Sequence, residues 1–204
     1  MDLKILDEIS SLTNKYNAKL LPVIKDKKIE DIKKIYDVGF REFGENRLEQ
    51  LQSHKDKLKD SKFHFIAPLQ SRKIKEIMNN CVSVHTLSRE KEALIINEVY
   101  SNQNIFVQIN ISNDQNKSGI KAEDVDVFFS IFENLNYFPA GIMCIPSLEI
   151  NPKIAFSKMY KINENIKNNY KNYIGELSMG MSDDYKIALD YGATIIRIGS
   201  KIFK

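Results

Sequence analysis

Short apolar runs alternate with amphipathic stretches along most of the 204-residue chain. Each apolar run has the length of a strand, and most of the stretches between them repeat their apolar residues at helical spacing. A regular succession of strand and helix is typical of a parallel sheet with helical crossover connections. The predicted strands are 20–24, 40–43, 63–67, 81–86, 104–111, 140–145, 176–180 and 194–198.

Predicted helices fill the segments between these strands, and one more helix precedes the first strand. They are 2–16, 28–38, 45–59, 70–79, 88–100, 122–135, 151–170 and 182–191. Two of them are followed by a glycine, Gly39 or Gly192, as expected where a left-handed residue ends a helix. The helix at 2–16 is amphipathic and adds to the strand–helix repeat rather than belonging to it.

About eight strand–helix units are the number found in a (β/α)8 barrel, the TIM barrel. We therefore predict one α/β barrel domain over residues 1–204, with an extra N-terminal helix. An open doubly wound sheet is the structural alternative, but no G-x-G-x-x-G motif follows the first strand. Pro22 is unexpected in that strand, because barrel strands are paired on both sides and proline has no N–H to donate.

The composition argues against several classes of protein: nucleic-acid-binding, secreted, membrane-spanning and metal-binding. Hydrophobic residues make up 43% of the chain, and the net charge of +3 is spread along it, so nucleic-acid binding is weakly supported. The first ten residues are charged and lack the apolar core of a signal peptide, and no run approaches the ~18 apolar residues of a membrane span. Cys81 and Cys144 show no metal-ligand spacing and are expected to be buried thiols. We expect a cytoplasmic protein without a metal, nucleic-acid or membrane partner.

Lys25 follows the first apolar strand directly, and functional residues of such barrels lie at the C-terminal ends of strands. Partial desolvation of this lysine is expected to lower its pKa and to free the amine for Schiff-base chemistry. On position alone, a lysine whose head group simply reaches solvent is the favoured explanation. Lys27 and Lys28 are alternative candidates for the reactive amine.

A phosphate site is predicted in the loops after the seventh and eighth strands, where this fold commonly has one. Those loops contain Ser178, Ser182, Arg197, Gly199 and Ser200. Hydroxyls, backbone N–H groups and a cation suit a phosphate dianion, although Ser182 can also be the N-cap of the following helix. A lysine and a phosphate site at one barrel mouth suit a phosphorylated aldehyde, such as pyridoxal 5′-phosphate (PLP) or an intermediate of a sugar-phosphate aldolase.

The three histidines give weaker signals. His64 lies inside a strand, where a hydrogen-bonded core histidine is expected. His85 is a candidate for the lining of the mouth, and His54 lies in a polar helix and is expected to be solvated. Residues 44–46 can be read simply as an N-cap turn.

The motifs FGEN, HFIAPLQS, KSG, SMGMSDD and RIG occur in this order and together are highly specific. They closely resemble the pyridoxal phosphate homeostasis proteins, and the likeness runs from about residue 19 to the C-terminus. The resemblance implies an alanine-racemase-like barrel that binds PLP covalently. It further implies a monomer that stores and delivers the cofactor in vitamin B6 homeostasis, without established turnover, through transient contacts with PLP-dependent enzymes.

By this resemblance, six residues bind the cofactor: Lys25, Asn46, Ser178, Arg197, Gly199 and Ser200. Lys25 is the Schiff-base lysine, and Arg197 faces the pyridine nitrogen, where a cation disfavours ring protonation and weakens the ring as an electron sink. Asn46 lies near the cofactor, and the other three bind its phosphate. Lys117 corresponds to a lysine at the pocket mouth. No catalytic residue is predicted.

The sequence departs from the family pattern close to the reactive lysine. Ile24 and Asp26 replace a serine and a threonine, Ala67 replaces a glycine, and Ser200 replaces a threonine but keeps the hydroxyl. Asp26 is expected to alter the pKa of Lys25, because a carboxylate favours the charged amine.

Two enzyme classes are the alternatives to a carrier. An amino-acid racemase of this fold takes a tyrosine acid/base from a second domain, and no residues for such a domain follow the eighth predicted strand. A Schiff-base aldolase would use Lys25 without any cofactor.

Overall fold

The computed structural model describes residues 2–203, and its elements follow the predicted alternation. The strands are β1 (Lys19–Pro22), β2 (Glu42–Glu45), β3 (Lys62–Phe65), β4 (Ser83–Leu87), β5 (Asn104–Asn110), β6 (Ile120–Lys121), β7 (Gly141–Met143), β8 (Glu176–Ser178) and β9 (Ile195–Ile198). The α-helices are α1 (Leu3–Lys15), α2 (Ile29–Asp37), α3 (Leu48–Lys57), α4 (Ile74–Asn80), α5 (Glu90–Val99), α6 (Val125–Ser130), α7 (Pro152–Asn169) and α8 (Tyr185–Asp190).

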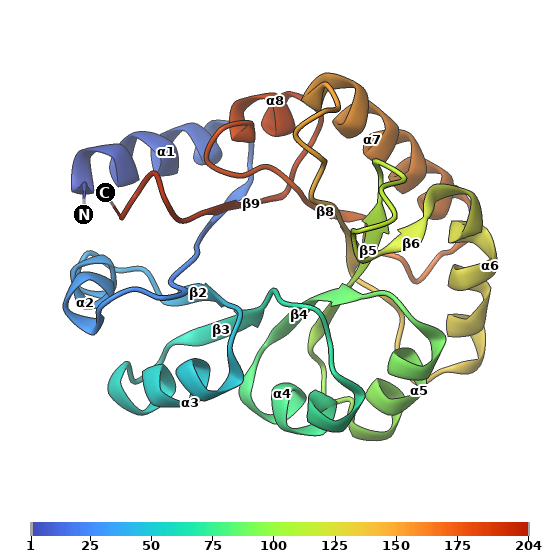
Figure 1. Cartoon of the computed structure of the whole chain (residues 1–204), viewed down its shortest axis with the longest axis horizontal. Helices are drawn as coiled ribbons and strands as arrows, with labels where there is room; N and C mark the ends of the chain where they lie inside the picture. The colour runs from blue at the N-terminus through green and yellow to red at the C-terminus, as the bar shows by residue number, and fades with distance from the viewer. Residues whose placement is uncertain (1, 204) are drawn as a thin grey trace.

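The strands form a parallel sheet with the order β1-β9-β8-β7-β5-β4-β3-β2, and β6 pairs with β5 beside this path. The two ends of the sheet meet at one bridge between Val23 and Gly44, where the amide of Ile24 donates to the carbonyl of Gly44 at 3.0 Å. Figure 1 shows the resulting nearly closed ring of strands with the helices outside it. The predicted (β/α)8 barrel with a leading helix is confirmed.

Pro22 is accommodated by the incomplete pairing of β1 with β2. In β1 and the residues directly after it, the amides of Lys19 and Val23 donate toward the β9 side, whereas that of Ile24 donates to β2. Because strand amides alternate in direction, the nitrogen of Pro22 faces β2. The two strands join only at the next residue, so no ladder bond is lost at Pro22.

Side chains that face the barrel axis differ from those that face the helices. Leu21, Phe106, Met143 and Ile195 form a small apolar cluster inside the barrel. A much larger apolar core fills the layer between the strands and the surrounding helices. Polar side chains occupy the rest of the interior, as described below. The large apolar core therefore stabilises the packing of the helices on the strands. The polar side chains inside the barrel are available for binding.

Several predicted boundaries were wrong. Helix α3 begins at Leu48, because Glu45 still belongs to β2. The predicted helix at 122–135 consists of α6 between two 3-10 turns, η2 (Ala122–Asp124) and η3 (Ile131–Asn134), and another such turn, η1 (Ser71–Lys73), precedes α4. The N-cap of α8 is Asp184, so Ser182 does not cap that helix.

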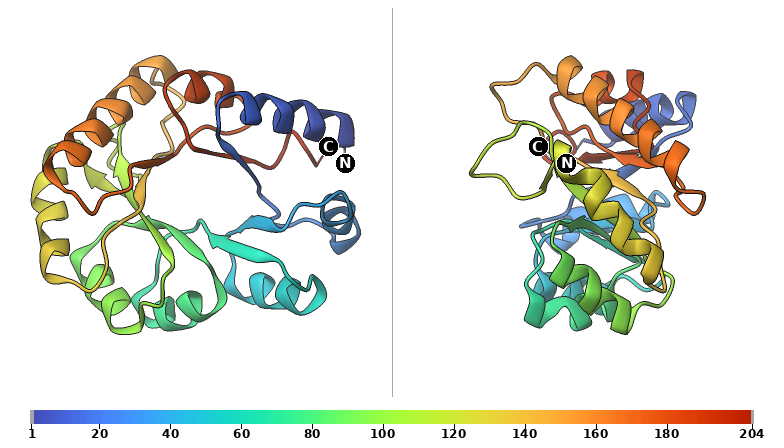
Figure 2. Two further views of the ribbon diagram at one scale, coloured as in Figure 1. Left: turned by 180° about the vertical axis from the view of Figure 1, so that it is seen from behind. Right: turned by 90° about the vertical axis from the view of Figure 1, so that its right-hand side faces the viewer.

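Two long loops lie together at the C-terminal ends of the strands. The amide of Ser147, after β7, donates to Ser112 Oγ, after β5, at 2.8 Å. The right-hand view in Figure 2 shows these two segments projecting from the same side of the molecule. At the chain ends, the amide of Asp2 donates to the carbonyl of Ile202 at 2.9 Å, which holds α1 against the C-terminal segment.

The burial of the two cysteines and the character of the helices agree with what was expected from the composition. Cys81 and Cys144 are buried and free, as predicted, and burial raises the pKa of each thiol to about 12. Among the described residues, no helix combines the length and the apolar character needed to cross a bilayer.

Candidate functional site

Lys25 lies at the C-terminal end of β1, two residues beyond the bridge to β2. The residue is exposed, so the predicted partial desolvation is not found. The turn that follows contains Asp26 at φ 56°, a left-handed conformation that aspartate adopts more readily than most residues. The carboxylate of Asp26 pairs with Arg47 Nη1 at 2.9 Å. Asp26 therefore has its own cation and is not the partner of Lys25.

The neighbouring lysines have other surroundings. Lys27 Nζ lies 5.5 Å from the centroid of the Phe203 ring, and Lys28 is the N-cap residue of α2. Neither follows the strand directly. Of the three lysines in this segment, Lys25 is the one placed at the strand end.

Asn46 follows β2, which is the strand that meets β1 at the bridge. Its Oδ1 atom is buried and accepts no hydrogen bond from residues 2–203. The loop is shaped by the buried carboxylate of Glu45, whose Oε1 accepts from the amides of Asn46 at 2.7 Å and Arg47 at 3.2 Å. A buried acceptor without a partner is costly. Asn46 is thus equipped to accept from a ligand.

Arg197 is a buried cation inside the barrel, with 4% of its surface exposed. Its Nη1 donates to the carbonyl and the hydroxyl of Ser178, both at 2.7 Å, and its Nη2 donates to the carbonyl of Cys144 at 2.9 Å. Burial lowers the pKa of Arg197, but a guanidinium stays charged at neutral pH. No carboxylate of residues 2–203 forms an ion pair with it, and these three bonds leave two of its five N–H donors for other acceptors.

The residues predicted to bind phosphate do not all come together. Ser178 is fully buried, and its hydroxyl contacts Arg197 and His85, so it lies in the barrel interior. Ser200 instead lies beside Ser182, with the two Oγ atoms 3.0 Å apart. At Gly199 the backbone lies close to that of Val23: a Cβ atom on residue 199 would lie 3.2 Å from the carbonyl oxygen of Val23.

The histidine predictions had mixed outcomes. His64 is buried and bonded at both ring nitrogens, as expected of a core histidine. His85 does not line the mouth, because its strand turns it to the interior and it is fully buried. His54 is not solvated: it is 8% exposed, and its Nδ1 lies 3.4 Å from the carboxylate of Glu45.

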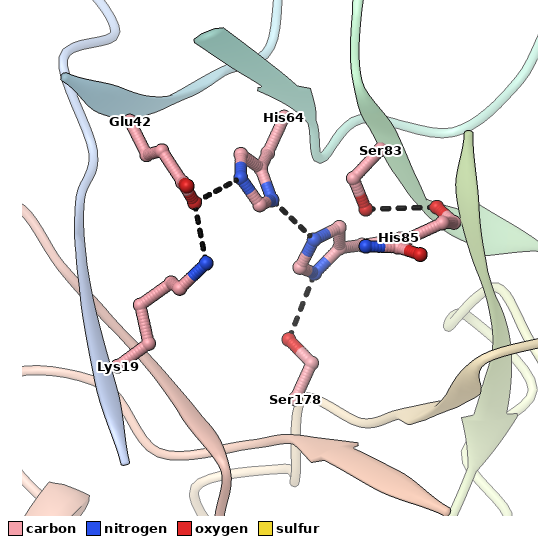
Figure 3. A network of polar contacts seen from close by, with 7 residues as sticks. Lys19, Glu42, His64, Ser83, His85 and Ser178 are labelled. Atoms are coloured by element: carbon pink, nitrogen blue, oxygen red, sulfur yellow. Dashed lines mark hydrogen bonds and ion pairs between the residues drawn. The ribbon is translucent and has the colours of Figure 1, made fainter. Parts of the chain in front are cut away.

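A polar network inside the barrel joins five strands (Figure 3). Lys19 Nζ donates to Glu42 Oε2 at 2.7 Å, and the same oxygen lies 3.1 Å from His64 Nε2. His64 Nδ1 lies 3.0 Å from His85 Nε2, and His85 Nδ1 lies 2.8 Å from Ser178 Oγ. Lys19 and Glu42 were not among the predicted site residues. Alternate residues of a strand face the same side, so Lys19 with Leu21, and Glu42 with Gly44, could have been predicted to face the barrel interior.

Lys117 lies at the mouth, in the loop after β5. Its Nζ donates to the carbonyls of Ile145 at 3.2 Å and Pro146 at 2.7 Å. The loop folds back onto β5, where a Cβ atom on Gly119 would lie 2.6 Å from the amide nitrogen of Asn110. Lys117 therefore connects two of the loops that border the mouth.

Comparisons with known proteins agree with this geometry. Residues 5–204 match the family described as alanine racemase, N-terminal domain. A pyridoxal phosphate homeostasis protein of Aquifex aeolicus is 33% identical over 91% of this chain and 86% of its own length, and one of Haemophilus influenzae is 36% identical over 93% and 86%. The chain belongs to the pyridoxal phosphate homeostasis protein family. Its resemblance to that family in sequence motifs is thereby confirmed.

Solved structures place this family member among racemase-like barrels. The structure of PipY from Synechococcus elongatus without PLP has a TM-score of 0.88 and 25% identity, and covers 98% of this chain and all of PipY. PipY with PLP bound matches at a TM-score of 0.85. Alanine racemase from Corynebacterium glutamicum, at 13% identity and a TM-score of 0.76, shares the fold over 61% of the racemase chain.

Proposed function

We propose that this protein binds PLP as a Schiff base on Lys25 and serves intracellular vitamin B6 homeostasis. The observation that carries the proposal is Arg197, a buried cation with free N–H donors and no carboxylate partner among residues 2–203. Such a group needs an acceptor from a ligand, because an unpaired buried charge is costly. The names of the relatives, pyridoxal phosphate homeostasis proteins, agree with the proposal.

The residues at the mouth fit the different parts of the cofactor. The amine of Lys25 condenses with an aldehyde, with loss of one water, and a bound PLP supplies that aldehyde. Arg197 offers donors to the pyridine nitrogen and disfavours its protonation. The orphan acceptor Asn46 Oδ1 lies at the end of the neighbouring strand.

The phosphate group suits the loops after β8 and β9. We assign it to Gly199 and Ser200, with Ser182 as an added hydroxyl, because the two serines lie 3.0 Å apart and Gly199 leaves the backbone bare. Ser178, the other expected ligand, we assign to Arg197 instead, because its hydroxyl is buried against the guanidinium.

Storage and delivery fit the site better than turnover. A racemase of this fold needs a tyrosine acid/base beside the reacting carbon, and none of the residues that we assign to the cofactor is a tyrosine. The cation at the pyridine nitrogen also weakens the ring as an electron sink. We extend the proposal to a cytoplasmic monomer that makes transient contacts with PLP-dependent enzymes, in keeping with its two buried free thiols.

The Lys25 assignment is tested by borohydride reduction of protein incubated with PLP, followed by mass spectrometry of its peptides. Reduction fixes an imine as a stable amine, so the modified lysine carries the added mass. We expect modification at Lys25 in the wild type and in Lys28→Ala, and none in Lys25→Ala. Modification of another lysine in the wild type would refute the assignment.

The enzyme alternatives are tested on the same preparations. Purified protein that shows no visible absorbance after incubation with PLP would favour the cofactor-free aldolase. Sustained racemisation of any member of a panel of amino acids, lost in Lys25→Ala, would establish the racemase. We expect visible absorbance without racemisation.

A further inference from the structure

A row of hydrogen-bonded side chains crosses the barrel interior from β2 to β9. It runs from Glu42 through His64, His85 and Ser178, and Arg197 Nη1 donates to Ser178 Oγ at 2.7 Å. Figure 3 shows the row from Glu42 to Ser178. Every link is between 2.7 and 3.1 Å long. The row therefore joins the N-terminal end of the barrel to the cation that we place against the cofactor.

The carboxylate of Glu42 sets the direction of the row. The hydrogen bond from His64, with further help from Lys19, lowers the pKa of Glu42 to about 2. An ionised carboxylate only accepts hydrogen bonds. His64 must therefore carry its hydrogen on Nε2, the nitrogen that faces Glu42.

The donor and the acceptor of each further link in the row follow in the same way. With one hydrogen, on Nε2, the His64 ring presents Nδ1 as an acceptor, so His85 donates from Nε2. Burial holds the pKa of His85 well below its usual value, so its Nδ1 is also a bare acceptor and takes the hydroxyl hydrogen of Ser178. A guanidinium only donates, so Ser178 Oγ accepts from Arg197. Every hydrogen in the row points toward Glu42.

Ionisable groups on four strands surround the two rings. They are Lys19 on β1, Glu42 on β2, Glu176 on β8 and Arg197 on β9. Lys19 is about half exposed and bonds Glu42, whereas burial raises the pKa of Glu176. His85 adds no charge and stacks on Phe106, with the ring centroids 4.4 Å apart.

We infer that Glu42, His64 and His85 are positioning residues, which hold the guanidinium of Arg197 in one orientation through Ser178. The row also turns the Ser178 hydroxyl toward His85 and away from any ligand. The hydrogen arrangement is a property of the protein alone. The effect on the cofactor rests on the proposed function.

The hydrogen arrangement is tested first, on protein free of cofactor. Nitrogen NMR of histidine rings distinguishes the two neutral tautomers and the imidazolium, and the chain has only 3 histidines. We expect His64 and His85 to have the Nε2–H tautomer near neutral pH, with His54 outside the row as the internal reference. An Nδ1–H tautomer or an imidazolium at either ring would overturn the inference.

Glu42→Gln then tests the coupling to Arg197. The side chain of Glu42 is 28% exposed, so an amide of the same shape is tolerated there. The amide loses the fixed acceptor, and we expect mixed tautomers at His64 and about tenfold weaker binding of PLP. Glu176→Gln is the matched control: it neutralises a carboxylate at the same barrel end outside the row, and we expect neither change.

The outcomes separate the two proposals. Wild-type tautomers in Glu42→Gln, or equal losses of affinity in both variants, would overturn the positioning role. Wild-type protein that shows the expected tautomers but binds no PLP would refute the proposed function, and with it the role of the row toward the cofactor. Binding of PLP by protein with the opposite tautomers would overturn the inference alone.

Discussion

The two ends of the barrel differ in how their polar groups are satisfied. At the N-terminal end, Lys19 and Glu42 begin their strands and bond each other, and Glu42 continues into the buried histidines. At the C-terminal end, Lys25 is exposed, and Asn46 Oδ1 is buried without a partner among residues 2–203. At the first end, the satisfied end, the side chains from Lys19 to the histidines bond each other, and the second, binding end has groups left for a ligand.

This difference distinguishes polar residues that stabilise the fold from polar residues that are available to bind a ligand. Buried polar groups normally find partners within the protein, so an unsatisfied one at a strand end indicates a binding site. Arg197 belongs to both sets: Ser178 and Cys144 accept from part of its guanidinium, and the rest is free. It is the residue through which changes at the satisfied end are expected to reach the binding end.

The largest effect is expected from Gly141→Ala, at the N-terminal end. A Cβ atom there would lie 2.1 Å from the carbonyl oxygen of Glu176, so β7 and β8 would have to separate. We expect a loss of about 3 kcal/mol or more in the free energy of unfolding, measured with urea.

Two glycines serve as controls for that prediction. Gly199→Ala at the C-terminal end meets its nearest atom at 3.2 Å and should cost about 1 kcal/mol. Gly39→Ala has positive φ but open space and should also cost about 1 kcal/mol, from strain alone. A Gly141→Ala variant as stable as these two would contradict the tight closure of the N-terminal end.

Acid should weaken the N-terminal end through Glu42. Its pKa is lowered from 4.5 to about 2 in the folded state, so its contribution to stability is complete above about pH 4.5 and is lost as the pH falls toward 2. With a discount for its partial exposure, we expect Glu42→Gln to lose about 1 to 2 kcal/mol near neutral pH and much less near pH 2.

Urea unfolding at a series of pH values measures this difference. Glu49→Gln is the control, because Glu49 is exposed and bonds Lys73 on the surface. We expect its stability difference to be small throughout. A Glu42→Gln difference that is independent of pH would show that the carboxylate charge is not what stabilises this end.

Strand periodicity predicted the outer layer of the barrel better than its interior. The apolar runs identified all the strands of the ring, because a parallel strand buried on both faces is apolar almost throughout. The two-residue strand β6 and the interruption of the helix around α6 were not predicted, because these segments are too short to show a periodic pattern. The position of Lys25 at a strand end was predictable for the same reason.

Contacts across the barrel were not predictable from the sequence. Ser178 is the first residue of the SMGMSDD motif and was predicted as a loop serine, but its inward orientation on β8 places it against Arg197 and His85. The polar network also required knowledge of strand order, since Glu42, His64 and Ser178 are far apart along the chain. Side-chain alternation predicts which residues face inward, and only the closed sheet determines which of them meet.

The smallest effect is expected from Asp26→Asn at the rim of the mouth. Its pair with Arg47 joins two side chains that are 55% and 57% exposed, and exposed pairs contribute little. Asparagine also tolerates the left-handed backbone of this turn, at φ 56°. We expect a change of less than about 0.5 kcal/mol in the free energy of unfolding by urea. Asp26→Val, which suits that backbone poorly, should be clearly less stable than Asp26→Asn. A large loss in Asp26→Asn would mean that the C-terminal end, like the N-terminal end, depends on its own ion pairs.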